Sequence, residues 1–137
     1  MPVSLAASAV EHVGIAAVGP DSVLTRLLGC EAITGRRMPS GVAVGRFGPG
    51  NHLELVWPYR TGSPIETFLD RRGAGLHHLA FRVEVPIESV REQLLSTSTR
   101  LIGNGLDRSS DGRKCFFIHP HATGGVLIEV VEGEIDG

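Results

Sequence analysis

The sequence contains few cysteines and no excess of positive charge. Its two cysteines, Cys30 and Cys115, are too few for a disulfide framework, and we interpret both as small buried hydrophobic residues. The formal net charge of −2 gives no sign of the basic surface that nucleic acids or anionic membranes attract. We therefore expect no nucleic-acid partner.

Long apolar runs are also missing. A helix that crosses a membrane needs about 18 consecutive apolar residues, and every apolar run here is much shorter. Residues 1–10 are apolar but include no lysine or arginine, whereas a signal peptide begins with a positively charged segment. These absences predict a cytoplasmic protein that does not associate with membranes.

What is present is typical of a single globular domain, residues 1–137. Apolar residues make up 42% of the chain and charged residues 20%, and the chain is long enough to bury a core. The 18 glycines are well spread, which indicates many short elements joined by tight turns.

One order of elements is predicted to occur twice. Module one, about 10–60, has a strand, a short helix that Gly29 would end, and two strands, at residues 11–18, 21–28, 41–48 and 52–57. Module two, about 76–132, has the same order at residues 76–84, 86–96, 114–119 and 125–132. A helix at 63–72 connects the modules: Ser63 and Glu66 form a capping box around Pro64, and Gly73 ends it.

The two modules also align residue by residue. HVGIA (12–16) lies over HLAFR (78–82), and LELV (53–56) lies over IEVV (128–131). Because side chains two residues apart share a face of a strand, His12 and His78 lie on the faces with the smaller residues. His77 belongs to the opposite, bulkier apolar face, which we expect to pack against a helix.

One histidine and one glutamate from each module form a candidate metal site. Taken singly, a mid-strand glutamate is usually solvated and a strand histidine is usually structural, so the hypothesis depends on the repetition in phase. Two imidazoles and two carboxylates suit a six-coordinate divalent ion and leave two positions for a bidentate substrate. The four residues are His12, Glu54, His78 and Glu129. The histidines near strand ends are interpreted as surface or substrate-side residues: His52, His119 and His121.

Four segments carry a wider resemblance: EHVGIAAV (11–18), HLELVWP (52–58), SPIETFLDRRGAGLHHLAFRV (63–83) and GRKCFFIHPHATGGVLIEVVE (112–132). In these segments the sequence resembles the methylmalonyl-CoA epimerases of the vicinal oxygen chelate superfamily, which also includes glyoxalase I. The last two segments are the more specific to the epimerases.

The resemblance implies an α+β fold in which two βαβββ modules form an open, cup-shaped mixed sheet, usually in a homodimer. It implies a divalent ion, with Co²⁺ the first choice and Mn²⁺, Ni²⁺, Zn²⁺ or Mg²⁺ the alternatives. The implied metal ligands are His12, Glu54, His78 and Glu129. The implied partner is an acyl-CoA substrate, and Lys114 matches a CoA-binding position. Further candidates for CoA contacts are Arg60, Arg82 and Arg113.

The implied activity is that of an isomerase that interconverts (2R)- and (2S)-methylmalonyl-CoA, by removal of the C2 proton through a metal-stabilised enolate. Some epimerases have a second carboxylate base at the position of Val44, and some have Gln at the position of Glu54. Because valine cannot accept a proton, we expect Glu129 to act as one base and Glu54 as the base on the opposite face. The alternatives are a lactoylglutathione lyase of the glyoxalase I type and a non-catalytic binding or resistance protein of the same fold.

Overall fold

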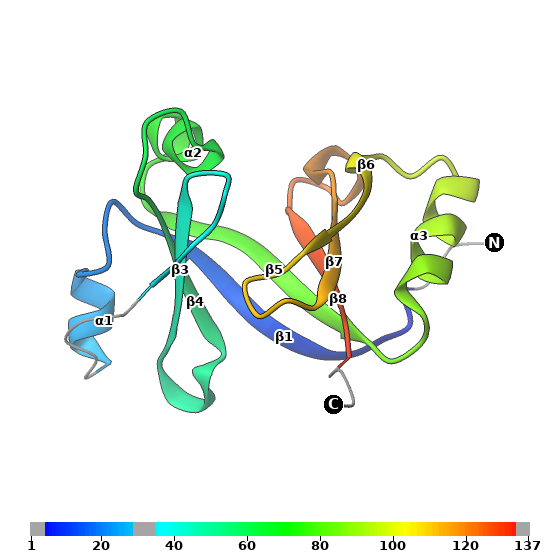
Figure 1. The fold of residues 1–137 in the computed structure, drawn as a ribbon, viewed down its shortest axis with the longest axis horizontal. Coiled ribbons are helices and arrows are strands. Elements are labelled where there is room, and N and C mark those ends of the chain that lie inside the picture. The colour runs from blue at the N-terminus through cyan, green and yellow to red at the C-terminus, as the bar shows by residue number, and fades with distance from the viewer. Residues whose placement is uncertain (1–4, 29–34, 134–137) are drawn as a thin grey trace. The chain divides into compact units, whose positions relative to one another are not determined.

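The computed structural model of the protein describes residues 5–28 and 35–133. Its helices and strands can be followed in Figure 1. The chain divides into two compact units, His12–His77 and His78–Gly137 with Met1–Glu11. The predictions for Gly29 and Cys30 concern residues outside the described part of the chain.

Module one contains every element predicted for it and one strand more. Its elements are β1 (Ala7–Ala16), α1 (Val23–Leu27), β2 (Arg36–Arg37), β3 (Val42–Phe47) and β4 (Leu53–Pro58). β1 runs parallel to β4, β4 pairs antiparallel with β3, and β3 pairs antiparallel with β2. The short 3-10 helix η1 (Pro49–Asn51) joins β3 to β4 in a turn at Pro49-Gly50, where Gly50 has a φ of 67° that favours glycine.

Module two repeats this pairing. Its elements are β5 (Gly75–Val83), α3 (Ile87–Ser96), β6 (Leu101–Arg108), β7 (Lys114–Ile118) and β8 (Ile128–Glu132). β5 runs parallel to β8, which pairs antiparallel with β7, and β7 pairs antiparallel with β6. The 3-10 helix η2 (Pro120–Ala122) joins β7 to β8, as η1 joins β3 to β4. The prediction of an α+β fold with two βαβββ modules is therefore confirmed.

The structure contains two strands that the sequence pattern does not predict, β2 and β6. β2 has only two residues, which is too short for any alternation to appear. β6 contains Gly103 and Gly105 and shifts its register between Ile102 and Asp107. A strand interrupted in this way does not show the regular apolar alternation from which strands are predicted.

The connecting helix α2 (Pro64–Arg72) lies where predicted, but its capping box forms only in part, because the Glu66 side chain accepts the Gly62 N–H at 3.3 Å. The Ser63 hydroxyl accepts a hydrogen bond from the Glu66 N–H at 3.3 Å, and Pro64 occupies the first turn. Gly73 ends the helix with a φ of 75°, and its N–H donates to the Leu69 carbonyl at 2.8 Å.

The helices α1 and α3 cover the bulky apolar faces of the two modules, as predicted. α1 contributes Leu24 to a cluster with Ile15 and Leu55, and α3 contributes Ile87, Val90 and Leu94 to a cluster that includes Phe116 and Val130. α2 packs against the other face of module one, where Ile65 contacts a cluster with Ala16 and Val56. The face that carries His12 is therefore partly covered by a helix, which the sequence pattern does not predict.

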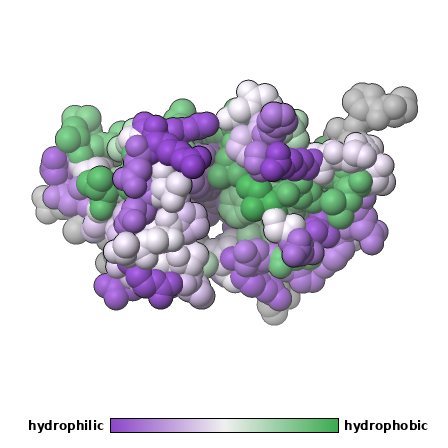
Figure 2. All heavy atoms as spheres, turned by 90° about the horizontal axis from the view of Figure 1, so that it is seen from above, coloured by the Kyte–Doolittle hydropathy of each residue, from purple (hydrophilic) through white to green (hydrophobic). Residues whose placement is uncertain are grey.

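The surface of the described residues mixes hydrophilic and hydrophobic side chains (Figure 2). Val18, Leu27 and Leu76 are among the most exposed large apolar residues. Scattered residues of this kind are ordinary in a globular domain, so they do not identify a partner. Within residues 5–28 and 35–133, no helix has the length and apolar character needed to cross a membrane.

Candidate metal centre

Module one brings His12 and Glu54 together where β1 runs parallel to β4. Gly14 lies opposite Glu54 in this pair, so His12 lies two residues earlier on the same face. His12 Nε2 is 3.5 Å from Glu54 Oε1, and the two side chains are only 2% and 8% exposed. The atoms that these residues could offer to a metal ion lie within 4.8 Å of each other. We refer to this pair as half-site one.

Module two repeats the arrangement with His78 and Glu129, which we refer to as half-site two. Ala80 lies opposite Glu129, so His78 again lies two residues before the paired position. His78 Nε2 is 3.3 Å from Glu129 Oε1, and the two side chains are 4% and 6% exposed. Both glutamates are thus buried, which contradicts the alternative that they are ordinary solvated residues.

The residues of each half-site fit a divalent ion. Burying a carboxylate is costly unless a hydrogen bond, an opposite charge or a metal compensates it. An imidazole nitrogen and a carboxylate oxygen from two paired strands are the kinds of ligand that divalent transition metals accept. In both modules the histidine lies two residues before the residue that pairs with the glutamate. The two modules therefore present equivalent pairs of metal-binding groups.

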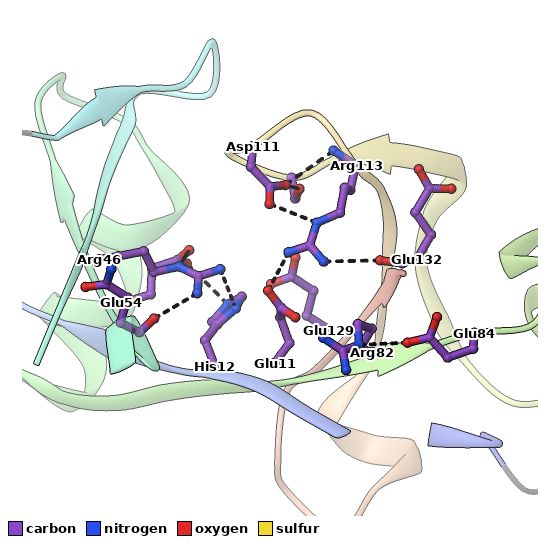
Figure 3. Close-up of polar contacts among 12 residues, drawn as sticks. Glu11, His12, Arg46, Glu54, Arg82, Glu84, Asp111, Arg113, Glu129 and Glu132 are labelled. Atoms are coloured by element: carbon purple, nitrogen blue, oxygen red, sulfur yellow. Dashed lines mark hydrogen bonds and ion pairs between the residues drawn. The ribbon is translucent and has the colours of Figure 1, made fainter. Parts of the chain in front are cut away.

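Half-site one includes a third residue, Arg46, which the alternation of residues within single strands does not predict (Figure 3). Arg46 lies opposite Glu54 in the β3–β4 pair. Its Nε is 3.2 Å from Glu54 Oε2, and its Nη2 is 2.9 Å from His12 Nδ1. The Pro49-Gly50 turn is the signal that could have revealed it, because a hairpin closed there places residue 46 opposite residue 54.

Half-site two has Phe117 where half-site one has Arg46. Phe117 lies opposite Glu129, just as Arg46 lies opposite Glu54. The Phe117 ring meets the His78 imidazole edge-on, with 6.2 Å between the ring centroids. The two half-sites therefore match in their candidate ligands and differ in the charge of this neighbour.

Val44 and Cys115 also occupy equivalent positions. Val44 lies opposite Val56, and Cys115 lies opposite Val131. Val44, at the position where some epimerases carry a base, packs with the apolar cluster of Ile65. Cys115 is buried, as predicted, and burial raises the pKa of its thiol, with the charge of Glu129 raising it further. The thiol is therefore held in its unreactive form.

The candidate CoA-binding lysine, Lys114, forms a surface ion pair. Its Nζ is 2.7 Å from Glu88 Oε1, and the side chains are 39% and 53% exposed. The hydrogen bond between them raises the pKa of Lys114 and lowers the pKa of Glu88. Lys114 is therefore charged and at the surface.

Arg113 differs from Lys114 because it is buried. Its guanidinium forms ion pairs with Glu11 and Asp111, and it donates a hydrogen bond to the Glu132 carbonyl at 3.3 Å (Figure 3). Burial by itself lowers the pKa of Arg113, but Glu11 and Asp111 outweigh this effect and the pKa is raised. These contacts within the chain give Arg113 a structural role.

The other histidines lie where the sequence pattern placed them. His77 is half-buried, and its ring meets Phe68 edge-on at 4.8 Å between centroids. His52 and His121 are exposed, and His119 Nδ1 accepts the His121 N–H at 3.0 Å at the start of η2. None of these contacts involves a half-site residue.

Comparisons with known proteins relate the chain to one group of enzymes. No family model matches it. An ethylmalonyl-CoA/methylmalonyl-CoA epimerase of Cereibacter sphaeroides is 34% identical over 84 residues, which is 60% of this chain and 62% of that protein. The matches span between 48% and 62% of the length of the curated relatives.

Solved structures match over a larger part of the chain. The crystal structure of methylmalonyl-CoA epimerase from Mycobacterium tuberculosis has a TM-score of 0.82 and 30% identity, covering 98% of this chain and 94% of that chain. A methylmalonyl-CoA epimerase in complex with methylmalonyl-CoA and NH4+ has a TM-score of 0.78 and 25% identity, covering 93% of this chain and 95% of that chain. The matches therefore extend over both modules.

Proposed function

Because the chain belongs to the methylmalonyl-CoA epimerase family of the vicinal oxygen chelate fold, we propose that it is a metal-dependent isomerase that interconverts (2R)- and (2S)-methylmalonyl-CoA. The observation that carries the proposal is the buried histidine–glutamate pair that occurs in both modules at the same register. The similar structure that contains methylmalonyl-CoA supports an acyl-CoA substrate.

In this proposal the two half-sites together hold a single divalent ion. Its ligands are His12, Glu54, His78 and Glu129. The equivalent registers of the two pairs support a ligand set with one pair from each module. When bound, the ion would act as a Lewis acid toward the negative charge that develops on the thioester oxygen. Co²⁺ is our first choice, and the donor set also suits Mn²⁺, Ni²⁺, Zn²⁺ or Mg²⁺.

Two glutamates of the chain would move the protons. The C2 hydrogen lies between a thioester and a carboxylate, so its removal leaves an electron pair that is shared with the thioester oxygen. Glu129, as a carboxylate, would accept the C2 proton, and Glu54, in its protonated form, would deliver a proton to the opposite face of C2 and become ionised. The reverse reaction exchanges these roles. Val44 packs among apolar side chains, which supports assigning both roles to the half-site carboxylates.

The remaining parts of the proposal concern CoA and assembly. Lys114 is our candidate for a CoA phosphate, because its ion pair with Glu88 is exposed enough for a phosphate to replace the carboxylate. A homodimer and a cytoplasmic location are also proposed, the first from the family resemblance and the second from the composition.

Epimerisation measured on metal-stripped protein, with and without added Co²⁺, tests this function. We expect conversion of one epimer into the other only when the ion is present. Conversion of the hemithioacetal of methylglyoxal and glutathione, without action on methylmalonyl-CoA, would instead identify the lyase. No activity together with no metal-dependent rise in melting temperature would favour the binding protein.

A further inference from the structure

Arg46 fixes the protonation pattern of the His12 ring. A guanidinium has hydrogen-bond donors and no acceptor. In the 2.9 Å contact between Arg46 Nη2 and His12 Nδ1, the ring nitrogen must therefore be the acceptor. The ring proton then lies on Nε2, which faces Glu54 Oε1 at 3.5 Å. The three residues thus form a cluster to which Arg46 contributes a permanent positive charge.

This contact with His12 is incompatible with a metal ion on either ring nitrogen. An ion on Nδ1 would need the lone pair that Arg46 uses. An ion on Nε2 would need the proton to move to Nδ1, where it would point at an Arg46 donor. A metal-ligating histidine normally donates its second N–H to an acceptor, which a guanidinium cannot provide. Arg46 must therefore leave Nδ1 in both cases.

The second contact of Arg46, with Glu54, can persist. Arg46 Nε lies 3.2 Å from Oε2, whereas Oε1 is the oxygen nearer to His12. An ion could thus take Oε1 while Arg46 keeps Oε2. The guanidinium would still place a positive charge beside a divalent cation, which weakens the binding of that cation.

We propose that Arg46 is a built-in competitor of the metal ion, which holds half-site one in the metal-free protein and moves off His12 when an ion binds. The inference rests on the proposed metal site. The Arg46 side chain is 29% exposed, and its Nη1 donates to the Asn51 carbonyl at the surface, so it has a path toward solvent. Phe117 at the equivalent position of half-site two carries no charge, so His78 and Glu129 can accept an ion without displacing a guanidinium from that position.

Calorimetric titration of metal-stripped protein with Co²⁺ tests the inference. R46M keeps the length of the side chain and removes its charge, and R46K keeps the charge without the planar fork that makes both contacts. R26M is the matched control, because Arg26 forms a 2.8 Å pair with Asp21 in the same module, away from His12 and Glu54. Replacing groups that contact metal ligands usually lowers metal affinity. Here we expect R46M to bind Co²⁺ about tenfold more tightly or better, while R26M equals the wild type and R46K lies between.

The stability of the metal-free protein should change in the opposite direction. R46M leaves the buried Glu54 without its guanidinium, so we expect the melting temperature without metal to fall by about 4 °C. If the role of Arg46 were merely structural, R46M would lower both the stability of the protein and its metal affinity. Equal or weaker Co²⁺ binding by R46M would therefore overturn the inference while leaving the metal site intact.

Two further outcomes separate the inference from the proposed function. Binding of Co²⁺ by R46M but not by the wild type would support the competition in its strongest form. Binding by neither protein would overturn the metal site and the inference together. Long-range ¹H–¹⁵N spectra give an independent readout: we expect the His12 proton on Nε2 without metal, and a proton on Nδ1 in the metal-free protein would contradict the competitor role.

Discussion

The two half-sites have the same candidate ligands, a histidine and a glutamate, and different neighbours. In each, a histidine lies two residues before the residue that pairs with a buried glutamate. Beside Glu54 lies the cation of Arg46, whereas beside Glu129 lies the ring of Phe117. The two modules therefore share the histidine and the glutamate and differ at the residue that pairs with the glutamate from the neighbouring antiparallel strand. In the proposed mechanism, the two proton transfers at C2 would therefore involve carboxylates in unlike surroundings.

The largest effect that would test this comparison is expected from Glu129→Gln. The substitution keeps the shape of the side chain and removes its ability to accept the C2 proton. Because a general base contributes about 10²–10⁴-fold, we expect C2 deuterium exchange to fall by about 10³-fold. A variant that binds Co²⁺ and exchanges at the wild-type rate would show that Glu129 is not the base.

Glu54→Gln should have a smaller and more selective effect. Gln stands at this position in some epimerases, so we expect the variant to keep its metal. Epimerisation should fall by about 10²-fold, while exchange of the C2 hydrogen in one epimer persists, because only one face loses its acid and base. Full turnover would remove Glu54 as a base without removing it as a ligand.

Much of the site follows from the sequence because strand parity is a strong constraint. The alternation around His12 and His78 predicts which face each imidazole occupies, and the structure confirms that both rings are buried. The contact of Arg46 with Glu54 depends on the pairing of two strands across a turn. Such pairing is a non-local property that alternation within one strand does not encode.

The same distinction explains the missing strands and the covered face. β6 contains two glycines and a register shift, so its strand conformation is maintained by pairing with β7 rather than by its own sequence pattern. The amphipathic pattern of α2 predicts a helix with an apolar face. It does not predict which sheet face Ile65 will pack against, because that choice is set by the tertiary fold.

A smaller effect is expected from Lys114, at a position where the two modules also differ. The equivalent position of module one is the buried Ala43, so only module two has a surface cation here. If Lys114 contacts CoA, Lys114→Met should raise KM for methylmalonyl-CoA by about tenfold with kcat unchanged, since it removes binding shared by ground and transition states. Glu88→Gln, which removes the competing carboxylate, should not raise KM. Equal KM values for Lys114→Met and the wild type would exclude this contact.

The smallest effect is expected at the β6–β7 hairpin of module two. Burial alone would raise the pKa of Asp111, but hydrogen bonds from Ser109 and Arg113 outweigh it and lower the pKa below 3.8. A lowered carboxyl pKa stabilises the folded state above pH 3.8, and this contribution is lost as the pH falls through the folded pKa.

Ser109→Ala tests this contribution. At pH 7 we expect a loss of about 1 kcal/mol or less in the free energy of unfolding, because Asp111 is partly exposed. The difference from the wild type should shrink as urea unfolding is measured at progressively lower pH below 4. A difference that stays constant with pH would show that Ser109 does not act through the Asp111 charge.

Deuterium incorporation at C2 of methylmalonyl-CoA in D₂O, on metal-stripped protein with and without Co²⁺, tests most directly whether a divalent ion at the half-sites enables proton removal. We predict rapid exchange that requires the ion and is lost in His78→Ala. Exchange that is equally fast without metal, or no exchange when Co²⁺ is demonstrably bound, would contradict the proposed function.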